Sequence, residues 1–188
     1  MRKILLSIIV GLTATCAWAE APKGWTQVGT EMKSYALGVD ANCRHGQKPS
    51  AFVKSIKGSI KGWSGLSQHV MADQFRGKHV RFSAWVKTVG AEDYVGLWMN
   101  VSGSDGKIYA FDNMKSSHRA LSGDTDWKHC SIVLDVPAEA KWIGFGLVIS
   151  KEGQAWVSEC SLESVGSEVP VTAPEMNLTA PVNLDFTQ

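Results

Sequence analysis

The sequence lacks several features that would assign it at once to a functional class. Its 19 basic and 18 acidic residues nearly cancel, giving a formal net charge of +1. It therefore has no basic footprint for nucleic acid and no polybasic patch for a membrane surface. Beyond residues 1–19, no apolar run approaches the ~18 residues of a membrane-spanning helix. We expect a soluble chain with no nucleic-acid partner and no membrane insertion.

Cysteine and histidine are also scarce. The chain has four cysteines and five histidines, and it contains neither a C-x-x-C pair nor a Cys/His spacing typical of zinc ligands. Outside residues 1–19 the cysteines are Cys43, Cys130 and Cys160, and this odd count allows at most one internal disulfide. We expect no metal and no other cofactor.

Residues 1–19 have the pattern of a secretory signal. Arg2 and Lys3 precede the apolar run ILLSIIVGL, and the A-W-A sequence at 17–19 has the small-x-small form of a cleavage site. Cleavage after Ala19 would remove both cations and take the net charge from +1 to −1. We expect an exported protein, periplasmic or extracellular.

Short alternating segments separated by turn residues predict an all-β protein. Gly, Ser, Asp or Pro separates nearly every pair of segments, and no long segment has a helical period. This spacing favours an antiparallel sandwich or barrel whose sheets each bury one face. The expected strands are 34–39, 50–56, 65–72, 79–88, 93–101, 108–113, 127–136, 142–150 and 154–163.

Several sequence blocks resemble those of one family. The blocks are GKHVRFSAWVKT, GLWMNVSG, FDNM, R-x-x-x-G-x-T-D-W, IVLDVP, IGFGLVIS and GQAWVSECSLE. They are similar to a galactose-binding-like β-jelly-roll domain, close to the CenC-like carbohydrate-binding modules, a subgroup also found beside AraC-type regulators. The resemblance covers about residues 24–165 and implies a two-sheet antiparallel jelly roll of about nine strands. Residues 166–188, with three prolines, are interpreted as a C-terminal tail that either docks on the sandwich or stays disordered.

The resemblance also bears on metal and anion binding. In carbohydrate-binding relatives an Asp-Asp pair on the last strand can help hold calcium, but Ser158 and Glu159 occupy those positions here. Because a hard oxygen ligand is lost, we expect no calcium site. Asn100 stands at a position where the resembling proteins have an arginine. A side chain that could form two hydrogen bonds with an anionic ligand is therefore lost as well.

The jelly-roll topology further implies how the cysteines lie. It places 79–88 between 127–136 and 154–163, so Cys130 and Cys160 would be two strands apart, roughly 9–10 Å. That separation exceeds the reach of a disulfide. We expect both to be buried core thiols, while the loop residue Cys43 could be free or bridge to another molecule.

The most distinctive surface is expected on the outer face of 93–101 and 142–150, which the resembling fold places side by side at its usual sugar-binding groove. Aromatic rings stack on sugar faces, and glycine beside tryptophan leaves a shallow depression. The alternative is that a loop or the tail covers these tryptophans. The candidate ligand-binding residues are Tyr94, Trp98, Asn100 and Trp142, with His69 from the strand 65–72.

A polar segment, residues 108–127, gathers acids, amides and cations. Such side chains satisfy the backbone groups of a long loop, so we interpret the segment as a structural clasp between the two sheets. The alternative is a rim of the ligand site formed by His118 and Arg119. The clasp residues are Asp112, Asn113, Arg119 and Asp126.

These observations favour an exported, non-catalytic module that binds a carbohydrate or glycan-like ligand on the concave sheet face. One alternative is a structural or protein-interaction domain of the cell envelope without a small ligand. Another is a hydrolase that uses loop carboxylates, because glycosidases need two acids across a cleft and Asp105, Asp112, Asp124 and Asp126 lie in or near loops. No catalytic residue is assigned, since no nucleophile elbow occurs in a strand–turn–helix context.

Overall fold

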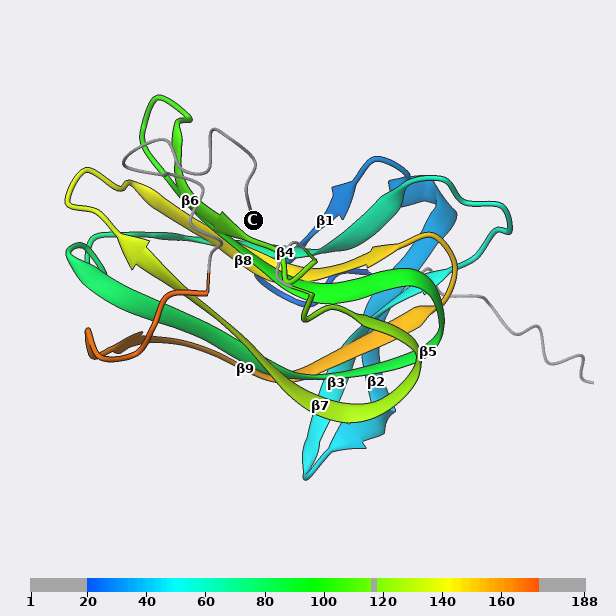
Figure 1. Cartoon of the computed structure of the whole chain (residues 1–188). Helices are drawn as coiled ribbons and strands as arrows, with labels where there is room; N and C mark the ends of the chain where they lie inside the picture. Colours follow the sequence, from blue (N-terminus) through cyan, green and yellow to red (C-terminus); the bar gives the residue numbers. More distant parts are fainter. Residues whose placement is uncertain (1–19, 116–117, 173–188) are drawn as a thin grey trace, which may run out of the picture.

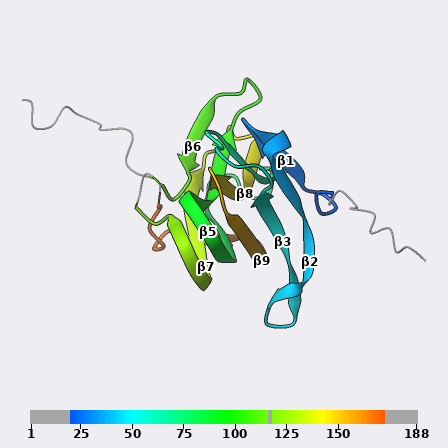
Figure 2. The ribbon, with the colours of Figure 1, turned by 90° about the vertical axis from the view of Figure 1, so that its right-hand side faces the viewer.

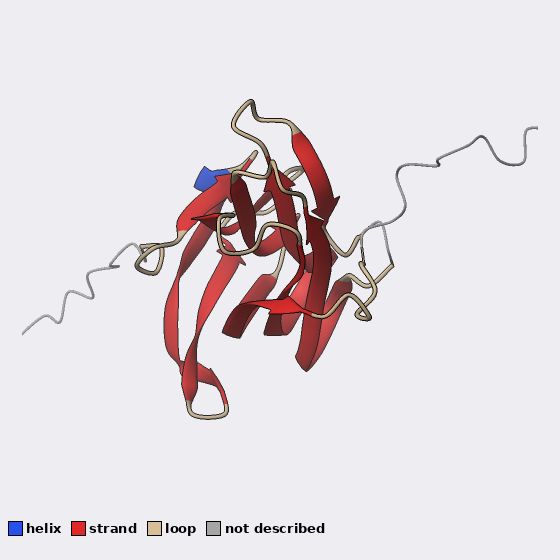
Figure 3. Cartoon of the chain, turned by 90° about the vertical axis from the view of Figure 1, so that its left-hand side faces the viewer, coloured by secondary structure: helices blue, strands red, loops and turns tan. Residues whose placement is uncertain are grey.

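The protein is an all-β antiparallel jelly-roll sandwich, as the sequence predicts. The computed structural model describes residues 20–115 and 118–172 (Figure 1). Its elements are β1 (Thr26–Gly29), η1 (Met32–Ser34, a 3-10 turn), β2 (Tyr35–His45), β3 (Lys48–Ser55), β4 (Trp63–Met71), β5 (Lys78–Ser102), β6 (Ile108–Asp112), β7 (Leu121–Val136), β8 (Trp142–Ser150) and β9 (Gln154–Val165). Figure 3 shows that strands and loops dominate, and no helix in the described part is long and apolar enough to cross a membrane.

Strand β5 belongs to both layers of the sandwich. Its first half pairs with β7 and β9, and its second half pairs with β8 and β6. One layer therefore runs β7-β5-β9-β3-β2, and the other runs β6-β5-β8-β4-β1 (Figures 1 and 2). We call the second one the upper layer, after its place in Figure 1.

The core lies between the two halves of β5 and the strands beside them. The predicted inward faces of 79–88, 93–101 and 142–150 are all buried, which confirms the alternation read from the sequence. Complete burial of a large aliphatic or aromatic side chain contributes about 1.5–3 kcal/mol, so this stripe is a major source of stability. The residues of β5 with no exposed surface are Val80, Phe82, Ala84, Val86, Val95, Leu97, Met99 and Val101.

Two expectations about the strands are wrong. The expected strands 79–88 and 93–101 are one continuous strand, β5. The chain bends at Gly90 (φ +59°) and its register with β7 shifts there, but the two strands remain paired on both sides of the bend. The short strand β1 was not expected. It has only four residues, and none of them is fully buried, so it carries no hydrophobic alternation.

The cysteines follow the prediction only in part. Cys43, Cys130 and Cys160 are all free thiols, and Cys130 is buried as expected; burial raises its pKa. Cys160 is exposed, which corrects the expectation of a core thiol. The register between β5 and β9 shifts just before it, and Glu159 adopts φ +54°, so the alternation is lost at this bulge.

The first residues of the expected tail contact the sandwich. The backbone nitrogen of Thr172 donates to the carbonyl oxygen of Val133 at 2.9 Å, and the Val169 carbonyl lies 2.8 Å from Nδ1 of His79. The expected docking of the final apolar residues concerns 180–186, which lie outside the described residues.

Candidate binding groove

Three neighbouring strands of the upper layer, β4, β8 and β5, align their outward-facing residues in rows. Each row contains one residue from each strand, and successive rows are two residues apart because side chains alternate between faces. The aromatic and glycine positions therefore gather on one surface. The rows are Trp63–Ser150–Tyr94, Gly65–Val148–Gly96, Ser67–Gly146–Trp98, His69–Gly144–Asn100 and Met71–Trp142–Ser102.

Two glycines keep the floor of this surface low. A Cβ atom at Gly146 would lie 1.8 Å from the carbonyl oxygen of Leu66, and one at Gly65 would lie 2.2 Å from the carbonyl oxygen of Leu147. Both obstacles are backbone atoms, which cannot move aside as a side chain does. Only glycine fits at these positions, and the low floor leaves space between the large residues around it.

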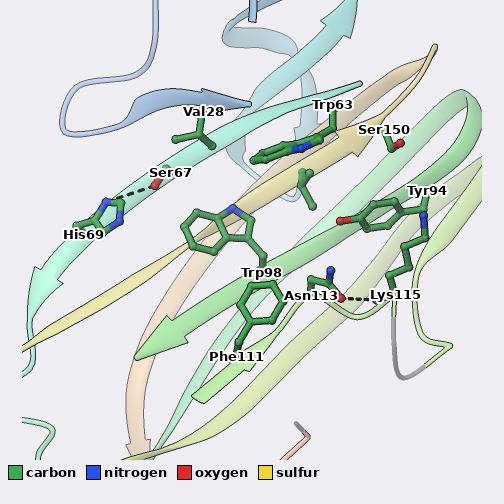
Figure 4. Close-up of a pocket in the computed structure, with 11 residues that line it drawn as sticks. Val28, Trp63, Ser67, His69, Tyr94, Trp98, Phe111, Asn113, Lys115 and Ser150 are labelled. Carbon is green, nitrogen blue, oxygen red and sulfur yellow. Dashed lines mark hydrogen bonds between the residues drawn. The ribbon is translucent and has the colours of Figure 1, made fainter. Parts of the chain in front are cut away.

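A groove of about 530 Å³ lies over these rows (Figure 4). Strand β1 and the start of β4 form one wall, and β6 with the loop after it forms the other. The lining residues are Val28, Trp63, Ser67, His69, Tyr94, Trp98, Phe111, Asn113, Lys115, Val148 and Ser150. Four of them are Trp, Tyr or Phe, and several others carry hydroxyl, imidazole, amide or ammonium groups.

Trp98 is the central side chain of the groove (Figure 4). Its Nε1 atom is buried and has no hydrogen-bond partner among the described residues, and it lies 3.0 Å from the position that a Cβ of Gly146 would take. An unsatisfied buried donor costs about 1–3 kcal/mol, so such groups are rare in native structures and each one calls for an explanation. The indole thus gives the groove a hydrogen-bond donor that residues 20–115 and 118–172 leave without a partner.

One end of the groove has a charged rim. Nζ of Lys115 lies 4.7 Å from the ring centroid of Tyr94 and 3.4 Å from Oδ2 of Asp93. The Ser150 hydroxyl donates to the same carboxylate oxygen at 2.8 Å. This bond first, and then Lys115, lower the pKa of Asp93, while burial, with the Asp93 charge adding to it, raises the pKa of Tyr94 to about 12. At neutral pH Tyr94 is therefore a neutral hydroxyl beside a cation.

The structure brings together three of the five predicted ligand-binding residues. His69, Tyr94 and Trp98 line the groove. Asn100 lies one row beyond the groove, and its Oδ1 accepts a hydrogen bond from the backbone nitrogen of Gly144 at 3.1 Å. Trp142 lies another row away, 41% exposed, outside the lining.

Sequence reasoning missed three prominent members of the lining. Trp63 pairs with Ser150 at the start of β4. The expected strand 65–72 begins two residues too late to include it, although Trp63 lies on the same face as Ser67 and His69. Phe111 joins the groove because β6 pairs with β5, and Lys115 follows in the next loop. That placement depends on tertiary pairing and has no local signal.

Two of the predicted clasp residues do meet. Asp112 is completely buried, and it forms an ion pair with the guanidinium of Arg119. Its Oδ1 accepts the backbone hydrogen of Met114 at 2.8 Å, and Nη1 of Arg119 donates to the Ser131 carbonyl of β7 at 2.6 Å. The pair therefore connects β6 in the upper layer with β7 in the other. Asn113 accepts the backbone hydrogen of Lys115 at 3.2 Å and lines the groove.

The fourth predicted clasp residue, Asp126, is placed elsewhere. It lies within β7, its side chain is 85% exposed, and it pairs with Lys87 at 2.8 Å rather than with Arg119. The physical reason is that β7 begins at Leu121, so Asp126 lies on the outer face of the other layer. His118, the alternative rim residue, is exposed and is not part of the lining.

The loop carboxylates do not converge on the groove. Asp124, in β7, accepts a hydrogen bond from the backbone N–H of Gly90 in β5 at 2.6 Å. Asp105 accepts one from the backbone N–H of Lys107, within its own turn, at 3.0 Å. In the described part of the chain no cluster of three or more His, Cys, Asp or Glu side chains could hold a metal ion. At the positions of the relatives' calcium pair, the Ser158 hydroxyl donates to the Pro49 carbonyl and Glu159 lies 3.2 Å from Nδ1 of His45.

Comparison with known proteins finds no matching family model. The chain is 37% identical over 168 residues to the uncharacterized HTH-type transcriptional regulator YbfP of Bacillus subtilis (strain 168), an alignment covering 87% of this chain and 56% of that protein. The chain thus spans about half the length of the curated relative that it matches.

Solved structures share the fold at low sequence identity. The enzymatically active domain of tailspike protein 4 from bacteriophage CBA120 aligns with a TM-score of 0.61 at 12% identity, covering 76% of this chain and 20% of that chain. The CBM22-1 xylan-binding domain of Paenibacillus barcinonensis Xyn10C aligns with a TM-score of 0.55 at 15% identity, covering 80% of this chain and 91% of that one. The fold of this chain is therefore that of a β-sandwich found in carbohydrate-binding modules and also within enzymes.

Proposed function

We propose that the chain is an exported, non-catalytic module that binds a carbohydrate in the groove over β4, β8 and β5. The observation that carries the proposal is the groove lining, in which aromatic side chains lie around an indole N–H that has no partner in the described part of the chain. A sugar ring has apolar faces and a hydroxyl edge, so it suits a site with stacking surfaces and a few polar groups. Trp63 and Tyr94 lie toward one end of the groove, and Trp98 lies in its middle with Phe111 beside it (Figure 4).

The chemistry of the lining supports binding without catalysis. Hydrolysis of a glycosidic bond by the usual route needs two carboxyl groups on opposite sides of the bond. No Asp or Glu occurs among the described residues that line the groove. Asp112, the acid closest in sequence to Phe111, is buried and paired with Arg119, so it is held away from a ligand.

The comparisons support this reading at the level of fold. Several similar structures are carbohydrate-binding modules, among them xylan-binding domains. The similarity to a region of an HTH-type regulator agrees with placement in the CenC-like subgroup that also accompanies AraC-type regulators. The signal pattern of residues 1–19 supports export, and recovery of secreted protein that begins at Glu20 would test it.

Titration of intrinsic tryptophan fluorescence with a panel of soluble polysaccharides tests the proposal. We expect at least one to shift the emission saturably, and Trp98→Ala to weaken that binding about tenfold or more. Trp127→Ala is the matched control, because Trp127 packs against His45 and does not line the groove. Equal loss in both variants, or no effect of Trp98→Ala, would contradict a ligand in this groove.

A second candidate function is protein binding, favoured by an exposed apolar row. Met71 and Trp142 are paired neighbours on the outer face and are 45% and 41% exposed. Exposed apolar clusters are common at interaction surfaces. A partner that binds there would be lost in Trp142→Ala and kept in Trp98→Ala, the opposite of the pattern expected for the groove ligand.

A further inference from the structure

Three side chains of the groove lining present hydrogen-bond donors to a ligand. Trp98 contributes an indole N–H without a partner among the described residues, Lys115 contributes an ammonium group, and Tyr94 contributes a hydroxyl that stays protonated at neutral pH. Indole and ammonium groups can only donate. No described residue of the lining itself is a carboxylate, and the Asp93 carboxylate at the rim already contacts Ser150 and Lys115.

Lys115 is the only charged residue among those that line the described groove. Its side chain is 52% exposed and stands over the Tyr94 ring, so the cation lies at the mouth of the groove. Its contact with Asp93 is long, at 3.4 Å, and the more favourable partner of that carboxylate is the Ser150 hydroxyl at 2.8 Å. Exposed ion pairs of this kind are weak, so a carboxylate of a ligand can compete for the ammonium group.

We infer that the groove selects an acidic glycan, one in which sugar rings carry carboxylate groups. The rings would stack on Trp63 and Trp98, and a ring carboxylate would accept hydrogen bonds from Lys115 and, beside it, from the Tyr94 hydroxyl. Charge-assisted hydrogen bonds are about twice as strong as neutral ones. This inference rests on the proposed function and narrows it to one substrate class.

The experiment compares polygalacturonate with the same polymer fully methyl-esterified, and with polyglutamate. Esterification keeps the sugar rings and removes the charge, whereas polyglutamate keeps the carboxylates and removes the rings. We expect polygalacturonate to bind at least about threefold to tenfold more tightly than its ester, and this preference to shrink at high salt. We expect polyglutamate not to bind.

Two lysine variants isolate the cation. Lys107→Gln is the matched control, because Lys107 also stands over a tyrosine ring, Tyr109, at 5.5 Å and lies outside the groove lining. We expect Lys115→Gln to remove the preference for polygalacturonate over its ester and Lys107→Gln to retain it, with both variants folded by circular dichroism.

The outcomes separate this inference from the proposed function. The acidic-glycan inference would be overturned, and a site for uncharged sugars would remain, if the ester bound as tightly as the acid or if only neutral polysaccharides bound. It would also be overturned if polyglutamate bound as tightly as polygalacturonate, which would indicate a general polyanion site. Retention of the preference in Lys115→Gln would also overturn it. Absence of binding to every polysaccharide, acidic or neutral, would remove the proposed function itself.

Discussion

The hydroxyl of Thr172 donates to Oδ2 of Asp112 at 2.6 Å, which joins residues 60 positions apart in the chain. The same carboxylate forms the ion pair with Arg119 and orients the first turn of the loop through Met114. Because Asp112 is completely buried, these partners replace the water that its side-chain oxygens would otherwise contact. The beginning of the C-terminal region and one wall of the groove are therefore fixed by a single side chain.

Replacing Arg119 by alanine should lower the free energy of unfolding by about 3 kcal/mol, because the buried Asp112 carboxylate would lose the cation with which it is paired. Urea denaturation followed by circular dichroism measures this loss. The control is Arg81→Ala, which breaks the exposed pair with Glu163 and should cost under about 1 kcal/mol. A folded Arg119→Ala protein of normal stability that no longer binds ligand would instead favour the rim interpretation of Arg119.

Gly146→Ala should destabilise the protein by about 2 kcal/mol or more, since the new methyl group meets the Leu66 carbonyl at 1.8 Å. Gly144→Ala should cost less. The neighbours of its Cβ are the ends of two side chains, Asn100 Oδ1 at 2.4 Å and His69 Nε2 at 2.8 Å, and these can move. Thermal unfolding of the two variants compares them directly, and equal stability would mean that β4 and β8 separate readily at Gly146.

The stability of the fold should decrease as the pH rises from about 10 to about 12. The pKa values of Tyr35 and Tyr94 are both raised from 10.0 to about 12, chiefly by burial. The unfolded chain therefore loses these protons first, and their contribution, complete below pH 10, is lost as the pH approaches 12. Guanidinium denaturation across this range should show the decrease, and Tyr94→Phe should make it shallower. An unchanged slope in that variant would show that Tyr94 ionises freely in the folded protein.

Trp142→Ala should reveal how far a bound glycan extends. If the ligand is confined to the groove, affinity should be unchanged, because Trp142 lies beyond Asn100 and outside the lining. We expect this result for short oligosaccharides, measured by calorimetry. A loss of about fivefold or more that appears only with longer oligosaccharides would instead show that the chain continues past Asn100 onto this tryptophan.

The inward faces could be predicted because alternation is a local property. Val95, Leu97 and Met99 follow the period of two, and any sheet with one buried side must place them inward. The continuity of β5 had no such signal, because Gly90 and the polar residues after it read as a turn. Only the pairing with β7 on one side and β8 on the other shows that the strand does not end there.

The lining residues on β4 and β5 could be predicted in part from the sequence, whereas those on β6 and in the loop after it could not. Tyr94 and Trp98 follow from the alternation of one strand, and His69 from its neighbour. Phe111 and Lys115 enter only because β6 and its loop return beside β5, a tertiary arrangement. The prediction of Asp126 as a clasp residue was wrong because its environment also depends on tertiary pairing, namely the register of β7 against β5.

The 25 residues of β5 also bear on how the protein reaches its structure. This strand must find partners that lie earlier and later in the chain, and β9 ends at Val165, more than sixty residues after Ser102. Such distant pairings make folding slow, because chain entropy is lost before the contacts compensate for it. Neither layer is complete without its half of β5, so we expect the sandwich to form in one cooperative step, with the tryptophans of the groove exposed to solvent until it does.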